Sequence, residues 1–210
     1  MLLLAGLGNP GAKYARNRHN VGIMAVAAIA DHYRLAAGRQ RFQGITRDGL
    51  IDGVKAVILM PETFMNESGR SVGEAMRFFK LTPASVVVFH DELDLAAGKL
   101  RVKTGGGHAG HNGLRSIDAH IGTDYRRVRI GIGHPGEKHK VTPHVLNDFS
   151  KDDTVWLDPL LNAIARACPH LMRGNDAEFQ SQVAAILNPI PPRKIVTPEK
   201  TAQENGRNGI

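Results

Sequence analysis

The sequence has a single cysteine, few aromatic residues and no long hydrophobic run. Because Cys168 has no partner among the 210 residues, no disulfide can form within the chain, which favours a reducing compartment such as the cytoplasm. Apolar stretches such as 54–61 and 86–89 are far shorter than the roughly 20 residues of a membrane-spanning helix. The first residues lack a basic start and a cleavage site, so we expect no signal peptide. We therefore expect a cytoplasmic protein without a membrane segment.

The composition is that of one ordinary globular domain. Hydrophobic residues make up 42% of the chain and charged residues 22%, which excludes a collagen-like or wholly disordered protein. From Asn188 onward the chain is rich in proline and polar residues. We therefore expect one domain over residues 1–188 and a disordered tail over residues 189–210.

Positive charge is concentrated in one part of the chain. The net charge is +7, and residues 99–140 hold nine Lys or Arg against three acids, a local charge of +6. A surface built from this stretch would attract a polyanion such as a nucleic acid. A solvated basic face without a partner has the same composition, so charge alone does not decide between the two.

Hydrophobic periodicity predicts an alternation of strands and helices. Strands are expected over residues 2–7, 42–47, 54–60, 85–90, 99–104 and 127–133. Helices are expected over residues 21–32, 68–80, 114–121, 151–167 and 176–187. This order predicts an α/β fold in a single domain, with a mixed, twisted sheet flanked by helices on both faces.

Two short glycine motifs could each indicate a different function. A GxGxxG pattern over residues 6–11 follows a strand, as in dinucleotide-binding proteins, but the helix begins too late and Asp31 lies inside it. These glycines would otherwise let the backbone of a loop approach a ligand closely. A GxSxG pattern over residues 69–73 would make Ser71 a nucleophile on a tight turn, whereas the periodicity places it in a helix. A serine hydrolase is therefore the alternative enzyme class.

Histidines and carboxylates suggest a metal site as a further alternative. His108 and His111 flank a glycine turn, and residues 90–94 add carboxylates that could complete a ligand set. The chain has neither a cysteine pair nor an HExxH motif. We therefore expect no metal and no cofactor, and metal binding stays open as an alternative.

Polar side chains follow the ends of several predicted strands. Asn9, Asn66 and Asp91 each come after a strand, and Asn112 closes the glycine loop. If these strands are neighbours in one sheet, their carboxyl ends form the usual crevice for a ligand. His19 lies at a loop edge that would reach the same crevice.

The residue types in this crevice suit hydrolysis of an uncharged acyl bond. A histidine paired with a carboxylate, here His19 with Asp91, is a competent general base because the carboxylate fixes the tautomer and stabilises the imidazolium. Carboxamides bind ester or amide carbonyl groups without adding charge. Direct attack by water would need no serine or cysteine nucleophile. The residues therefore predict a hydrolase beside a basic surface for a polyanionic carrier.

Four motifs resemble those of bacterial-type peptidyl-tRNA hydrolases and occur in the family's order. They are GLGNPGAKY with RHNVG (6–14 and 18–22), TFMNESG (63–69), HDELDL with GGGHAGHNGL (90–95 and 105–114), and RIGIGHPG (129–136). The similarity covers roughly residues 1–188, and linked motifs of this length are specific. Both glycine patterns above fall within loops of that family.

The resemblance implies a monomeric α/β enzyme that hydrolyses the ester between a peptide and the 3′ ribose of tRNA. It implies no cofactor and no obligate protein partner. By position, His19 would activate water, Asp91 would orient His19, and Asn112 would hold the water or the oxyanion. The substrate-binding residues would be Asn9, Tyr14, Met65, Asn66 and His111. Lys103 and Arg129 would grip the tRNA end phosphate.

The chain departs from the family pattern at three places. Asn17 stands where the family usually has Thr, which is expected to alter only a loop hydrogen bond. Ala96 replaces a usual Pro, and residues 60–62 replace a Lys-Pro lead-in. None of these is expected to touch the chemistry. The non-enzyme alternative is an RNA-binding module with a vestigial site, which turnover of an N-acyl-aminoacyl-tRNA would exclude.

Overall fold

A mixed seven-stranded sheet forms the centre of the fold. The structure is a computed structural model that describes residues 1–189, so the predicted disordered tail lies outside the described residues from residue 190 onward. The strands are β1 (Leu2–Gly6), β2 (Arg39–Arg41), β3 (Gly44–Ile51), β4 (Val54–Pro61), β5 (Val86–Glu92), β6 (Leu100–Thr104) and β7 (Arg126–Gly131). Their order is β2-β3-β4-β1-β5-β7-β6. The four neighbouring strands β4, β1, β5 and β7 are parallel to one another. At the two edges of the sheet, β3 pairs antiparallel with β4 and with β2, and β6 pairs antiparallel with β7.

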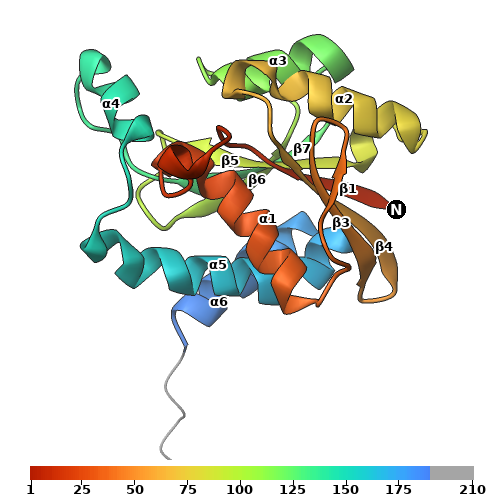
Figure 1. Cartoon of the computed structure of the whole chain (residues 1–210). Coiled ribbons are helices and arrows are strands. Elements are labelled where there is room, and N and C mark those ends of the chain that lie inside the picture. Colours follow the sequence, from red (N-terminus) through yellow and green to blue (C-terminus); the bar gives the residue numbers. More distant parts are fainter. Residues whose placement is uncertain (190–210) are drawn as a thin grey trace, which may run out of the picture.

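Helices cover both faces of the sheet, as the sequence predicted. They are α1 (Val21–His32), α2 (Ser68–Phe78), α3 (Asn112–Ile121), α4 (Val141–Leu146), α5 (Lys151–Met172) and α6 (Asp176–Leu187). Figure 1 shows α2 and α3 on one face and α1, α5 and α6 on the other. Two apolar cores correspond to these two layers. Among residues 1–189, none of the helices combines the length and apolar character needed to span a bilayer.

The central strands are apolar on both faces. On β5, Val87 and Phe89 belong to the core under α1 and α5, while Val86 and Val88 belong to the core under α2 and α3. A parallel strand covered on both sides has no polar face, so its sequence is a continuous hydrophobic run. The run ends at His90 and Asp91, where the strand reaches the site described below.

The structure contains two elements that the sequence did not predict. Strand β2 consists of three polar residues whose pairing with β3 holds it in place, so it carries no hydrophobic period. Helix α4 has six residues, of which only Val145 is buried, so its apolar pattern is too short to detect. Helix α5 also continues beyond its predicted end, through Pro169 to Met172. Its last turn buries Leu171 and Met172, and this packing outweighs the helix-breaking signal of proline.

The N-terminus of α1 packs directly on the backbone of β1 and β5. A Cβ atom on Gly22 would lie 2.1 Å from the Phe89 carbonyl oxygen and 2.6 Å from the Leu7 nitrogen. A Cβ atom on Gly6 would lie 2.4 Å from the Gly22 carbonyl oxygen. Only glycine permits this approach, because any side chain would collide with backbone. The contact holds the turn that carries His19 above the carboxyl ends of the two strands.

This close packing predicts the effect of adding one methyl group. We expect Gly22→Ala to lower the free energy of unfolding by roughly 1–3 kcal/mol, because the backbone of β1 or β5 must move. Alanine in place of glycine in a helix ordinarily stabilises by about 0.5–1 kcal/mol, so the expected sign is reversed. The measurement is urea unfolding, with Gly107→Ala as control, since a Cβ atom there meets nothing within 4 Å. An unchanged or raised stability of Gly22→Ala would contradict the contact.

Candidate active site

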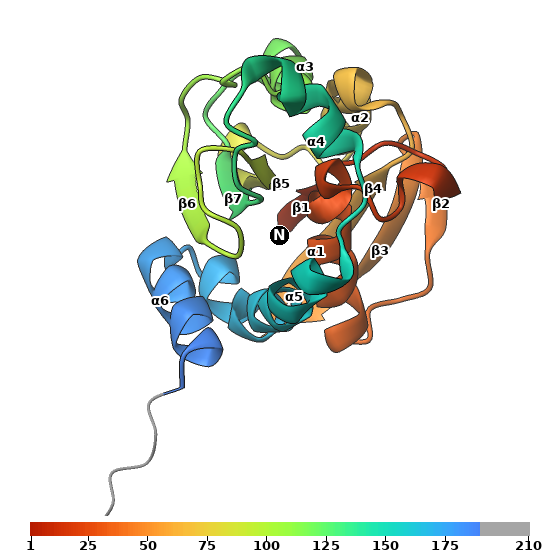
Figure 2. The same cartoon turned by 90° about the vertical axis from the view of Figure 1, so that its left-hand side faces the viewer.

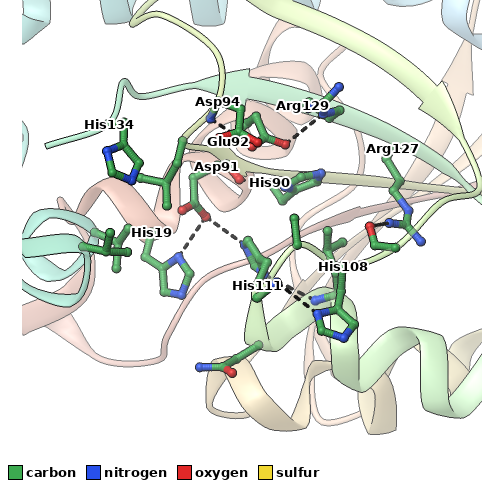
Figure 3. A pocket seen from close by; sticks show the side chains of 18 of the residues that line it. His19, His90, Asp91, Glu92, Asp94, His108, His111, Arg127, Arg129 and His134 are labelled. Carbon is green, nitrogen blue, oxygen red and sulfur yellow. Dashed lines mark hydrogen bonds and ion pairs between the residues drawn. The ribbon is translucent and has the colours of Figure 1, made fainter. Parts of the chain in front are cut away.

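A cavity of about 460 Å³ lies at the carboxyl ends of β5 and β7, between α3 and α4. Six residues to which the family resemblance gave a role line it, namely His19, Asp91, Lys103, His111, Asn112 and Arg129, and so does the metal candidate His108. Figure 3 shows the central groups, with dashed lines joining Asp91 to two histidines. The strand order β4-β1-β5 makes the predicted neighbours adjacent, but only Asn112 of the three expected carboxamides lines the cavity together with His19 and Asp91.

One carboxylate oxygen of Asp91 holds two imidazole rings. Its Oδ1 atom lies 2.8 Å from Nδ1 of His19 and 3.0 Å from Nε2 of His111. The side chain of Asp91 is only 3% exposed. Burial on its own would raise the pKa of Asp91, but the charges and N–H groups of His19 and His111 together lower this pKa well below its usual range. The site therefore contains a buried carboxylate that stays ionised.

The hydrogen bonds of His111 determine which of its nitrogens carries the proton. Its Nδ1 atom caps helix α3 by accepting from the backbone N–H groups of Gly113 (3.1 Å) and Leu114 (3.3 Å). An acceptor nitrogen has no proton, so in the neutral ring the proton is on Nε2 and is donated to Asp91. His111 thus joins the first turn of α3 to the buried carboxylate.

His19 has the opposite tautomer, with a free nitrogen in the cavity. Its Nδ1–H donates to Asp91, which leaves the lone pair on Nε2. In the part of the chain that the structure describes, Nε2 has no hydrogen-bond partner. The ring is largely buried and lines the cavity. A neutral imidazole with this arrangement can accept a proton from a molecule in the cavity.

His90 is a third histidine of the site, and no role for it follows from the sequence pattern. Its Nδ1–H donates to the Asp91 carbonyl oxygen at 2.7 Å, and its ring packs edge-on to His111 with centroids 5.2 Å apart. Its Nε2 atom is buried and has no partner within residues 1–189. Burial and the neighbouring His111 lower the pKa of His90 to about 3. Its only signal in the sequence is its position at the end of an apolar strand.

The low pKa of His90 predicts a specific loss of stability in acid. The unfolded chain binds a proton at an ordinary histidine pKa of 6.5, whereas the folded protein keeps His90 neutral down to about pH 3. Stability is therefore full above pH 6.5 and falls as the pH drops through this window, by on the order of 1 kcal/mol per pH unit.

Urea unfolding between pH 7 and pH 5 measures this slope. We expect His90→Phe to flatten it and the exposed control His32→Gln to retain it. A His90→Phe variant with the full wild-type slope would show that other groups cause the acid sensitivity.

Asn9 and Asn20 lock the loop after β1. The Asn9 N–H donates to Oδ1 of Asn20, and Nδ2 of Asn20 donates to the Asn9 carbonyl oxygen, both at 2.9 Å. Oδ1 of Asn9 in turn accepts from the Met65 N–H at 2.8 Å. Among the described residues, Nδ2 of Asn9 has no hydrogen-bond partner, so it can donate to a ligand.

Four of the predicted substrate-binding residues are not among those that line the cavity. Asn9 is held by the loop just described, and Tyr14 is half-buried beneath the ammonium of Lys13, 4.7 Å from its ring centre. Met65 is buried against Gly113, and Asn66 is exposed on the neighbouring turn. The structure thus brings together His19, Asp91, His111 and Asn112 around the cavity and does not include these four in its lining.

The basic stretch contributes fewer free charges than its composition suggests. The side chains of Arg126 and Arg127 are largely buried, and their guanidinium groups are paired with Asp176 and Asp118, each at 3.0 Å. Lys103 is exposed at the cavity rim and has no ion pair among residues 1–189. Counting charges along the sequence cannot distinguish such paired groups from free ones.

Arg129 and Arg127 have different surroundings on the same strand. Nε of Arg129 donates to Glu92 at 2.8 Å, and its two terminal nitrogens have no hydrogen-bond partner in the described part of the chain. Arg127 is buried above the Tyr125 ring and donates to the Gly107 carbonyl oxygen at 2.8 Å. Arg127 therefore fixes the glycine loop that forms one wall of the cavity.

The structure contradicts the serine and dinucleotide alternatives. Ser71 is fully buried in α2 and donates its hydroxyl to the Phe42 carbonyl oxygen, so it is not on a nucleophile turn. The glycines of residues 6–11 lead into a short 3-10 helix, and α1 begins only at Val21. The GxGxxG segment therefore does not present a helix N-terminus to a phosphate, and the GxSxG segment does not present an exposed nucleophile.

The residues that could hold a metal ion differ from the set that the sequence suggested, since His19 replaces His108. His108 accepts a hydrogen bond from Gly110 within its own loop. His19, Asp91 and His111 each offer an atom within 4.8 Å of the others, so they could hold an ion. That would require both imidazoles to release the protons they now share with Asp91.

Comparison with known proteins identifies the family. A family profile described as peptidyl-tRNA hydrolase matches residues 3–189. A peptidyl-tRNA hydrolase of Parvibaculum lavamentivorans is 60% identical over 205 residues, covering 97% of this chain and 100% of that protein. One from Cereibacter sphaeroides is 61% identical over 194 residues, covering 92% of this chain and 86% of that protein.

Solved structures agree with this match. The crystal structure of peptidyl-tRNA hydrolase from Acinetobacter baumannii superimposes with a TM-score of 0.83 at 41% identity, covering 88% of this chain and 95% of that one. The fold class and the resemblance noted in the sequence are thereby confirmed. The chain belongs to the peptidyl-tRNA hydrolase family of enzymes.

Proposed function

We propose that the protein hydrolyses the ester between an N-blocked aminoacyl or peptidyl group and the 3′ ribose of tRNA. Water is the nucleophile, His19 is its general base, and no covalent intermediate forms. The observation that carries the proposal is the 2.8 Å hydrogen bond from His19 Nδ1–H to Asp91, which leaves Nε2 free in the cavity. Membership of the family supports the choice of substrate.

The proposed reaction begins with proton transfer from water to Nε2 of His19. The resulting hydroxide adds to the ester carbonyl carbon, and the negative charge that develops on the carbonyl oxygen is bound by the Asn112 amide. When the tetrahedral intermediate collapses, the ester C–O bond breaks and the ribose oxygen takes the proton from the His19 imidazolium. Asp91 stabilises that imidazolium, and the products are a free tRNA and a peptide acid.

The remaining residues bind and position the substrate in this proposal. Asn9 offers its free Nδ2 to the peptide, and Asn66, Tyr14 and Met65 extend the contact along the neighbouring loop. His111 approaches the substrate beside Asn112 and fixes the other side of the Asp91 carboxylate.

We further propose that Lys103 and Arg129 bind the phosphate at the tRNA end. Lys103 and the free end of the Arg129 guanidinium lie at the same cavity as His19. All groups in this scheme come from one chain, so the proposed working unit is a cytoplasmic monomer comprising the domain of residues 1–188. Turnover of an N-acyl-aminoacyl-tRNA would exclude the alternative, a vestigial RNA-binding module.

The proposed base predicts a graded loss of activity. We expect His19→Ala to lower kcat by about 10²–10⁴-fold with folding intact, the range that a positioned general base contributes. Asp91→Ala should lower kcat less, because an unoriented imidazole can still accept a proton. The measurement is release of an N-blocked amino acid from tRNA, with circular dichroism as the folding check. A fully active His19→Ala enzyme would contradict the mechanism.

The same assay distinguishes the alternative mechanisms. Ser71→Ala and Cys168→Ala should retain nearly wild-type rates, since Ser71 is buried and burial raises the pKa of the Cys168 thiol to about 12. A chelator should leave the rate unchanged. Covalent labelling of Ser71 by a serine-directed probe would support the hydrolase alternative, and inhibition by the chelator would support a metal at His19, Asp91 and His111.

The tRNA contact predicts a salt dependence that differs between substrates. Each neutralised phosphate contributes a slope of roughly −0.7 to −0.9 in log K against log salt. KM for full-length peptidyl-tRNA should therefore rise steeply with salt, and KM for a short 3′-terminal fragment should rise less. Lys103→Ala and Arg129→Ala should each flatten the slope by about one contact.

A lysine near the amino end of an inner strand, away from the carboxyl ends that border the cavity, provides the control. Lys55 is exposed near the start of β4, so Lys55→Ala should keep the wild-type slope on both substrates. Equal salt responses of the two substrates, in the wild type and in both variants, would place the tRNA contact elsewhere.

A further inference from the structure

The turn that carries His19 is joined to the chain that leaves α4. The Arg18 N–H donates to the Asn147 carbonyl oxygen, and the Phe149 N–H donates to the Arg16 carbonyl oxygen, both at 3.0 Å. Asn17 and Asp148 form an antiparallel bridge between these two bonds. Figure 2 shows the chain from α4 to α5 passing in front of the start of α1. Two segments about 130 residues apart in sequence thus make a miniature ladder beside the site.

Side chains reinforce this ladder on both sides. Asn17 is 3% exposed, and its Nδ2 atom donates to Oδ1 of Asp148 at 2.7 Å. The Arg18 guanidinium donates to the Asp148 carbonyl oxygen at 3.0 Å and pairs with Asp153 at 2.7 Å. It also lies over the Phe149 ring, 5.5 Å from the ring centre. The departure at Asn17 from the family pattern therefore provides a buried contact rather than a minor change in a loop.

Asp153 connects this contact to the start of helix α5. Its carboxylate and the Ser150 hydroxyl form a capping box, and Trp156 donates to it as well. Burial on its own would raise the pKa of Asp153, but hydrogen bonds from Ser150 and Trp156 and the charge of Arg18 hold this pKa below its usual range. The ion pair with Arg18 therefore persists at neutral pH.

These contacts act on the residue next to them in the chain. We call residues 147–153 the strap. The two strap acids that contact residues 17 and 18, Asp148 and Asp153, do not line the cavity, so neither can touch the substrate there. The His19 ring makes one hydrogen bond to Asp91 and packs at a tilt against the His111 ring, with centroids 4.9 Å apart. Its backbone adds a further restraint, because the ladder holds the preceding residues 16–18.

We propose that Asp148 and Asp153 are positioning residues for His19. They hold the backbone of residues 16–18 so that Nε2 of His19 points into the cavity, and they join that backbone to α4, whose residues Val141 and Val145 form part of the cavity wall. The inference rests on the proposed function, since it requires His19 to be the general base. A displacement of about 1 Å at a reacting group can cost up to 10²-fold in rate, so the strap controls turnover rather than binding.

The first test removes or retains the hydrogen-bond acceptor at position 148. We expect Asp148→Ala to lower kcat for N-blocked aminoacyl-tRNA by about 10-fold or more, with KM unchanged, because His19 loses its alignment. Asp148→Asn keeps an acceptor for Asn17 and should restore most of the rate. Asp152→Ala removes a nearby exposed acid and should behave like the wild type.

The second test separates positioning from helix capping. Both Asp153→Ala and Ser150→Ala lose the capping box of α5, but only Asp153→Ala also loses the pair with Arg18 and the hydrogen bond from Trp156. We expect a fall in Tm for both variants, larger for Asp153→Ala, and a lower kcat for Asp153→Ala alone. A spectroscopic readout accompanies the rates: the downfield N–H proton shared by His19 and Asp91 should broaden in Asp148→Ala and stay sharp in Ser150→Ala.

Each outcome decides one of the two proposals. If His19→Ala is fully active, the proposed function fails whatever the strap variants do. If His19→Ala is inactive while Asp148→Ala has wild-type kcat and a sharp N–H signal, the function stands and the positioning role is wrong. Equal losses of kcat in Asp153→Ala and Ser150→Ala would likewise reduce the role of Asp153 to capping.

Discussion

The site depends on one buried carboxylate oxygen that accepts hydrogen bonds from two imidazole rings. Asp91 has this position because β5 is covered on both faces, so its first four residues are apolar and its polar residues come only at its carboxyl end. Its charge is tolerated in the interior because His19 and His111 both donate to it. The two rings have opposite tautomers. The acceptor nitrogen of His111 accepts hydrogen bonds from the first turn of helix α3, whereas the acceptor nitrogen of His19 has no partner among the described residues. This one carboxylate thus links the buried negative charge of the site to the orientation of the His19 ring and to the His111 side chain that caps α3.

Much of the fold and the centre of the site could be predicted from the sequence, for identifiable reasons. The apolar runs of β1, β4 and β5 have the character of parallel strands with two buried faces, and parallel strands end at the same edge of a sheet. That rule alone brings the region after β1 next to Asp91, and the structure places His19 within hydrogen-bonding distance of it. The pattern failed at β2 and α4, because an edge strand of polar residues and a six-residue helix carry too little periodicity to detect.

The features of the site that could not be predicted from the sequence are contacts between residues that are brought together only by the tertiary fold. Arg127 has the same spacing as the exposed residues of an edge strand, yet its partner Asp118 lies in α3 and its hydrogen-bond acceptor Gly107 lies in a loop. His90 continues an apolar strand, so its burial follows from the pattern, whereas its bond to the Asp91 carbonyl oxygen does not. The link between Asn17 and Asp148 spans 131 residues. No local propensity encodes a contact of that separation.

The glycine loop before α3 gives the cavity a wall with few side chains. Gly107, Ala109 and Gly110 line it, and the backbone at Ala109 and Gly110 is left-handed, with φ of +46° and +81°. Between His108 and His111 the wall therefore has no side chain larger than the methyl group of Ala109. The consequence is that a ligand on this side of the cavity meets mainly backbone between the two histidines, which can discriminate there by shape and by main-chain hydrogen bonding.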